Sequence, residues 1–247
     1  MFTILLRSLN IKLSIVTPQF RPDEIMTNHP ETTSSRHDLG GLVRAALLCL
    51  LTIAGFIAVD VAFFAQGESF KREGGGLETV SAVLYVAAAV VFFLRAPSAR
   101  WGQLFHVPAL MVLFAMRELD FDKAFTPAGV LSLRLYSGEA SVTTKLISGV
   151  VAAFAVYVIL RCVWRGVPAG FAALRQGALW PWFAVLAGGL VVFTKSIDGL
   201  GRKLLDFGIV ISDDLDASAS MIEEVGEAFI PVCAILAIVA CWKRRTT

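Results

Sequence analysis

The stretch that decides the fold is LFHVPALMVLFA, Leu104–Ala115, followed directly by MRELDFDK, Met116–Lys123. The first part is largely apolar, and the second holds five charged residues. A helix that rises about 1.5 Å per residue needs roughly 20 residues to cross about 30 Å of hydrocarbon. Counted from Arg100, such a helix places Arg117 and Glu118 near the far boundary of a membrane. Charges at that depth are costly and are typical of functional sites.

The whole chain has the composition of a membrane protein. Of its 247 residues 56% are hydrophobic, and the mean hydropathy is +0.71, which is too apolar for an ordinary soluble domain. Long apolar runs alternate with charged or Gly/Pro-rich connectors, which predicts an all-α integral bundle of about six transmembrane helices in the lipid bilayer. The expected spans are 41–66, 77–96, 101–119, 144–164, 178–198 and 219–242.

Residues 1–40 are polar and mixed, and they predict a disordered cytoplasmic tail ahead of a six-helix domain at 41–247. Met26 is an alternative start to Met1, so residues 1–25 are either an upstream extension of the reading frame or part of the tail. The tail has neither the apolar core nor the cleavage site of a signal peptide.

Charge asymmetry between the connectors predicts the orientation. Lys and Arg gather in alternate connectors and at the C-terminus, whereas beyond Asp38 every acid lies in the other connectors or in the helix ends that meet them. Because basic residues accumulate on the cytoplasmic side, both termini are expected in the cytoplasm, with the acidic connectors outside. A bacterial inner membrane is the expected location. No basic face or finger motif supports nucleic-acid binding.

Five charged residues are predicted to share one depth in the bundle. Each lies 16 or 17 residues from the cytoplasmic charge of its own helix, or about 24 to 26 Å at the helical rise. These candidate ligand- or ion-binding residues are Asp60, Glu78, Arg117, Lys145 and Glu227. A second set lies just above this layer and consists of Glu118, Lys195, Asp198, Glu223 and Glu224. Glu118 of this set is also a candidate ligand- or ion-binding residue.

Three of these charges oppose the helix dipole, which favours acids at N-termini and bases at C-termini. Asp60 and Glu118 are acids near C-terminal ends, and Lys145 is a base at a helix start. They predict an internal ion-pair network, most simply Lys145 or Arg117 with Asp60 or Glu118. The other acids also fit as ordinary first-turn residues, and Ser220–Glu223 has the spacing of a capping box.

Several local features carry architectural predictions. Gly188–Gly189 permits a close helix contact, and Gly226 with Pro231 predicts either a break beside Glu227 or a plain kink. A short interfacial helix is expected around residues 131–136. Charges spaced by three or four residues from Lys195 to Asp206 predict a continuation of the fifth span or a separate surface helix.

The residue types and motifs in the chain exclude several classes of catalytic and cofactor site. The chain has three histidines and no HExxH, CxxC or phosphate-loop motif, so no cofactor is evident except a divalent cation that the carboxylates could hold. Three functions stay open. The first is a small transporter or ion-coupled permease, which at this size would act as a homo-oligomer. The others are a membrane-embedded enzyme acting on lipid or exported peptide and an assembly or scaffold subunit.

Overall fold

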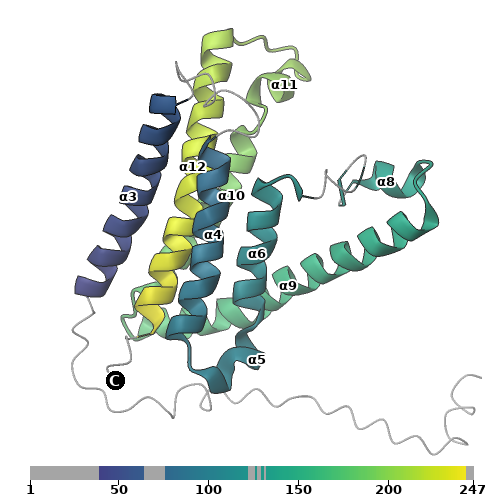
Figure 1. Cartoon of the computed structure of the whole chain (residues 1–247). Coiled ribbons are helices and arrows are strands. Elements are labelled where there is room, and N and C mark those ends of the chain that lie inside the picture. Colours follow the sequence, from purple (N-terminus) through teal and green to yellow (C-terminus); the bar gives the residue numbers. More distant parts are fainter. Residues whose placement is uncertain (1–38, 64–75, 122–125, 127–128, 131, 243–247) are drawn as a thin grey trace, which may run out of the picture. The chain divides into compact units, whose positions relative to one another are not determined.

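A computed structural model describes residues 39–63, 76–121, 126, 129–130 and 132–242 of the chain (Figure 1). Regular structure in this part is helical, and five helices are long and apolar enough to cross a membrane, which confirms an all-α membrane bundle. The predicted tail lies outside the described residues, except for Leu39 and Gly40, which begin the first helix.

The five long helices are the main elements of the bundle. They are α3 (Leu39–Phe63), α4 (Gly76–Arg95), α9 (Val142–Arg175), α10 (Trp180–Ile197) and α12 (Asp213–Cys241). The shorter elements are η2 (Ser98–Arg100), α5 (Trp101–Leu104), α6 (His106–Glu118), α8 (Leu133–Ser137) and α11 (Leu200–Leu205). α8 confirms the short helix predicted around residues 131–136, and its interfacial location stays a prediction. α11 is a separate helix after Gly199, whose φ is +59°, so the fifth span does not continue beyond Ile197.

Helix α4 lies at the centre of the bundle because it packs against α3, α6 and α12 (Figure 1). Its contact face combines small and aromatic residues, including Ala88 and Phe92, both fully buried. Small side chains let helix backbones approach closely, and close packing is a main source of helix association in lipid. On its other side α12 packs against α10, so α4, α6, α10 and α12 form one contiguous group.

The third predicted span, 101–119, is not one spanning helix. The chain is divided at Phe105 into α5 and the 13-residue α6, which is shorter than the five candidate spans of the described chain. Pro108 falls in the first turn of α6, where its missing N–H is tolerated. Further inside a helix its ring would clash with the carbonyl of Leu104, so the proline favours a helix start close to His106.

Helix α9 is longer than predicted. It runs for 34 residues through Pro168 to Arg175, so the expected connector after residue 164 is helical. At about 1.5 Å per residue its length is roughly 51 Å, well beyond the hydrocarbon thickness of about 30 Å. Its apolar section is mostly exposed, and it contacts α6 and α10.

Helix α12 begins seven residues before the predicted capping box. Ser212 is its N-cap, with the Oγ accepting a hydrogen bond from the Leu215 N–H at 3.4 Å, and three acids occupy the first turn. Ser220 lies inside the helix, so the predicted box is wrong. The helix continues through Pro231, so of the two alternatives at Gly226 and Pro231 the structure does not show the break beside Glu227.

Ser212→Ala is expected to lower the free energy of unfolding by about 0.5 to 1 kcal/mol, because the first turn of α12 loses its side-chain acceptor. Unfolding of the purified protein in mixed micelles of mild detergent and SDS measures the change. Ser220→Ala is the matched control and should be neutral or slightly stabilising, because alanine is the better residue inside a helix. Equal losses in the two variants would contradict the cap at Ser212.

Candidate functional site

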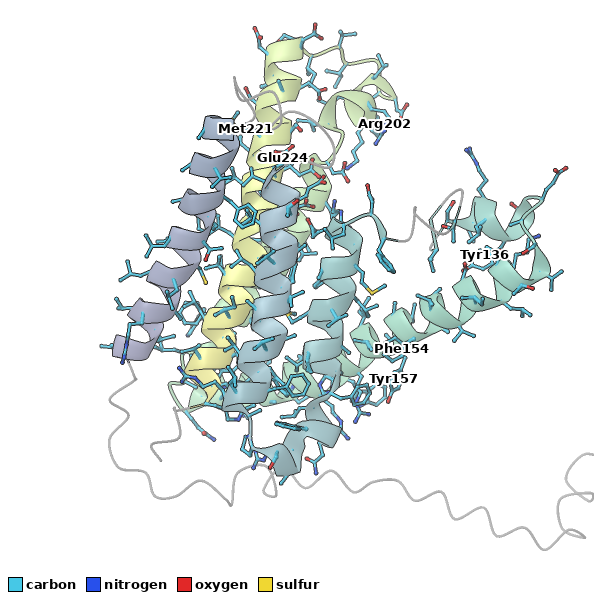
Figure 2. The ribbon with its side chains drawn as sticks, viewed as in Figure 1. Tyr136, Phe154, Tyr157, Arg202, Met221 and Glu224 are labelled. Carbon is cyan, nitrogen blue, oxygen red and sulfur yellow. The ribbon has the colours of Figure 1, made fainter. Side chains whose placement is uncertain are left out.

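Six charged side chains meet near the C-terminal ends of α6 and α10 and beside the middle of α12: five belong to these helices, and the sixth, Asp198, caps α10. We call this set the charge cluster, and it consists of Arg117, Glu118, Lys195, Asp198, Glu223 and Glu227. Figure 2 labels Glu224 on α12 and Arg202 on α11 at the same end of the molecule.

Lys195 is the base with the most acidic neighbours in the charge cluster. Its Nζ lies 3.0 Å from Glu227 Oε1, 3.2 Å from Asp198 Oδ2 and 3.6 Å from Glu223 Oε1. Glu223 and Glu227 are four residues apart and therefore share one face of α12. Lys195 is in the last turn of α10, where a base also suits the helix dipole.

Arg117 joins α6 to this group. Its Nη1 donates a hydrogen bond to Glu118 Oε1 at 2.9 Å and lies 3.5 Å from Glu227 Oε1. One oxygen of Glu227 is therefore close to two bases, Arg117 and Lys195, from two different helices. This shared oxygen connects the three helices through a single side chain.

A close contact between α10 and α12 sets the positions of these charges. A Cβ added to Gly226 would lie 2.7 Å from Cγ2 of Thr194, which is too short for any real contact. Thr194 is fully buried. The two residues directly precede Lys195 and Glu227, so the missing side chain of Gly226 permits the 3.0 Å approach between the base and the acid.

Three of the four acids of the cluster, Glu118, Glu223 and Glu227, are more buried than its two bases. The Glu118 side chain is 4% exposed and that of Glu227 12%, whereas Lys195 and Arg117 are 38% and 50% exposed. Long basic side chains can keep their charged ends in water while their stems cover apolar surface. The four acids outnumber the two bases, which leaves an excess of two negative charges when all are ionised.

A hollow of about 140 Å³ adjoins the cluster, and Glu118 belongs to both. It is lined by Glu78, Thr79, Glu118, Leu119 and Asp120. Asp120 has a φ of +47°, an uncommon conformation in which aspartate is enriched, and it follows the end of α6. Sequence reasoning did not select Asp120, although it lies in the charged stretch after Ala115.

The structure therefore brings together most of the predicted residues, and their role in binding stays a prediction. Six of them form the charge cluster, Glu78 lines the hollow, and Glu224 follows Glu223 on α12. Lys145 is not among them, because its Nζ donates to the carbonyl of Gly138 at 2.7 Å in its own connector. Asp60 lies in α3, but its side chain is outside what the structure describes.

Known proteins give no further assignment, because no family model, curated protein or solved structure matches the chain. Within the described residues, no group of three or more His, Cys, Asp or Glu side chains is placed to hold a metal ion. A divalent cation at the cluster stays a prediction. The geometry places the shielded carboxylate of Glu118 at the hollow and beside Arg117. Arg117 and Lys195 both lie close to Glu227.

Proposed function

We propose that this multi-pass membrane protein is a small ion-coupled transporter, and that its charge cluster binds a proton or a small cation during transport. The observation that carries the proposal is the position of Glu118. Its carboxylate is almost entirely shielded from water, is paired with Arg117 and lies on the wall of a hollow that it shares with Glu78 and Asp120. Acids at such positions in membrane proteins commonly mark ion and proton pathways.

The shared partners supply a way to couple binding to movement. Arg117 lies between Glu118 and Glu227, and Glu227 also pairs with Lys195. A proton or cation bound at Glu118 weakens the hold of that carboxylate on Arg117, which is then free to pair more closely with Glu227. This change links α6 to α10 and α12, and a ligand shifts such an equilibrium when it binds one arrangement better.

We also propose that the charge cluster faces outward from a bacterial inner membrane. Glu118 ends α6 and Glu78 begins α4. At the other ends of these helices Arg95 donates to the carbonyl of Trp242, and Arg165 donates to that of Gln103. This separation of bases from acids supports a cytoplasmic location for the basic end.

Flux measurements on reconstituted protein test the proposal. Proteoliposomes containing a pH-sensitive dye would be given an imposed pH gradient and then Na⁺, K⁺, or a panel of amino acids and sugars. We expect at least one probe to change the proton flux in the wild type. Glu118→Gln keeps the shape of the side chain but removes its charge, and it should reduce that flux at least tenfold.

Glu139→Gln is the matched control, because Glu139 is an exposed acid in the connector before α9. It should carry the wild-type flux. Glu118→Gln protein that is folded and transports at the wild-type rate would contradict the assignment of this carboxylate. A folded wild type that moves none of the probes would contradict transport and favour an enzyme or scaffold.

A further inference from the structure

A second group of polar side chains lies at the opposite end of α6 from the charge cluster. Here α9 places Arg161 and Arg165, one helical turn apart, against the junction between α5 and α6. Arg161 Nη2 and Arg165 Nη1 each donate to the carbonyl oxygen of Gln103 at 3.4 Å. Figure 2 shows Tyr157, one turn before Arg161, near the start of α6.

Arg161 is held in place by aromatic residues. Its guanidinium carbon lies 5.2 Å from the centre of the Phe105 ring and 5.9 Å from that of Tyr157, and these two rings are stacked on each other. Its Nη1 donates to the Tyr157 hydroxyl at 3.2 Å. A guanidinium fixed in this way loses little further freedom when it binds a ligand.

Among the described residues, no acid balances the positive charge of this pair. Neither arginine lies within ion-pair distance of a carboxylate in the described part of the chain, and the two bonds to Gln103 are long. Both arginines lie in the interior of α9, so the dipole of a helix end does not account for them.

Two buried nitrogens at this site, one of them in Arg161 itself, have no hydrogen-bond partner in the part of the chain that the structure describes. Arg161 Nε and His106 Nδ1 are shielded from solvent without a hydrogen bond within the described residues, and His106 as a whole is 3% exposed. Unsatisfied buried polar atoms are uncommon in native structures and each needs an explanation, such as a missing ligand or water. The site thus combines two guanidinium groups with unsatisfied polar atoms at one place.

We propose that Arg161 and Arg165 bind a phosphate group, carried either by an anionic phospholipid or by free phosphate. The planar N–H fork of arginine matches phosphate oxygens in pairs. Trp164, between the two arginines in sequence, is 83% exposed, and tryptophan is enriched at the boundary between membrane and water, where lipid headgroups lie. The site is separate from the charge cluster and does not depend on its proposed role.

Binding can be tested on the full chain in detergent. The probes are inorganic phosphate, with chloride at equal ionic strength as its control, and micelles doped with phosphatidylglycerol or phosphatidylcholine. We expect phosphate or phosphatidylglycerol to raise the midpoint of thermal unfolding of the wild type. Arg165→Gln should bind the effective probe at least threefold more weakly, and Arg165→Lys should fall between the two, because lysine keeps the charge but not the fork.

Arg175→Gln is the matched control, an exposed base on the same helix, and it should respond as the wild type does. A shift with inorganic phosphate would identify free phosphate as the ligand, and a shift with phosphatidylglycerol alone would identify the lipid headgroup. The proposal is overturned if neither probe stabilises the wild type, if folded Arg165→Gln responds fully, or if Arg175→Gln loses as much as Arg165→Gln. Lipid adducts counted by native mass spectrometry give a second measurement that is independent of unfolding.

Discussion

Lys195→Met is expected to lower the free energy of unfolding by about 2 kcal/mol at neutral pH. Lys195 Nζ lies within 3.6 Å of carboxylate oxygens from Asp198, Glu223 and Glu227. Methionine keeps much of the length of the side chain but leaves Glu223 and Glu227, which are 15% and 12% exposed, with one fewer base. Breaking a fully buried pair costs about 3 to 5 kcal/mol, and the 38% exposure of Lys195 makes the expected loss smaller.

The loss caused by Lys195→Met should shrink as the pH falls from about 8 to about 5. In the folded variant, carboxylates that have lost their base repel one another, and protonation removes this repulsion. Over this range the folded variant thus binds more protons than its unfolded state, and its stability rises as the pH falls. Unfolding in mixed micelles at several pH values measures this difference from the wild type.

Arg202→Met is the control for Lys195→Met, because Arg202 is an exposed base on the neighbouring helix α11 (Figure 2). It should change the free energy of unfolding by less than about 0.5 kcal/mol at every pH. A similar loss in both variants, or a loss in Lys195→Met that does not depend on pH, would show that the carboxylates around Lys195 do not need its charge.

Counting residues along single helices placed Arg117 and Glu227 at similar depths, and the structure brings them within 3.5 Å, although the count to Arg117 crosses the division between α5 and α6. Equal residue counts then give similar depths. The same count misplaced Lys145, since α9 is much longer than a membrane span and its start is not tied to the same boundary. Depth along one helix also carries no information about which face a residue occupies or which helix is its neighbour.

The helix boundaries, too, were only partly predictable from the sequence. The apolar runs predicted the long helices, but not that α12 begins at Asp213 in a polar stretch or that α5 and α6 are separate. The signals were in the sequence, as a serine followed by three acids and as Pro108 after a short apolar stretch. Such caps and breakers span only a few residues, so they are weaker signals than an apolar run of about 20 residues.

The close helix contact that the glycine pair permits is made at another glycine. A Cβ added to Gly188 or Gly189 would meet nothing within 4 Å among the described residues. The close approach is at Gly226, which the sequence presented only as part of a kink beside Pro231. A glycine pair is a visible pattern, but whether a glycine faces a neighbouring helix depends on the packing, which composition does not reveal.

Gly226→Ala is accordingly expected to destabilise the protein by about 2 kcal/mol, although alanine favours a helix over glycine by about 1 kcal/mol. The new methyl group would lie 2.7 Å from Cγ2 of the fully buried Thr194, so α10 and α12 must separate. Separation also lengthens the 3.0 Å contact between Lys195 and Glu227. Unfolding in mixed micelles measures the loss, and Gly189→Ala is the control that should be neutral or stabilising by up to about 1 kcal/mol.

A second substitution distinguishes steric conflict from other effects of Gly226→Ala. Thr194→Ser removes the Cγ2 methyl group but keeps the hydroxyl, whose Oγ1 donates to the Val191 carbonyl at 3.3 Å. In the double variant the added methyl group meets a space instead of another methyl group, so the two substitutions should be strongly non-additive, with about 1 kcal/mol or more of the loss recovered. Additive losses would mean that the contact between Gly226 and Thr194 does not hold α10 and α12 together. The approach of Lys195 to Glu227 would then have to be set by the ion pair itself.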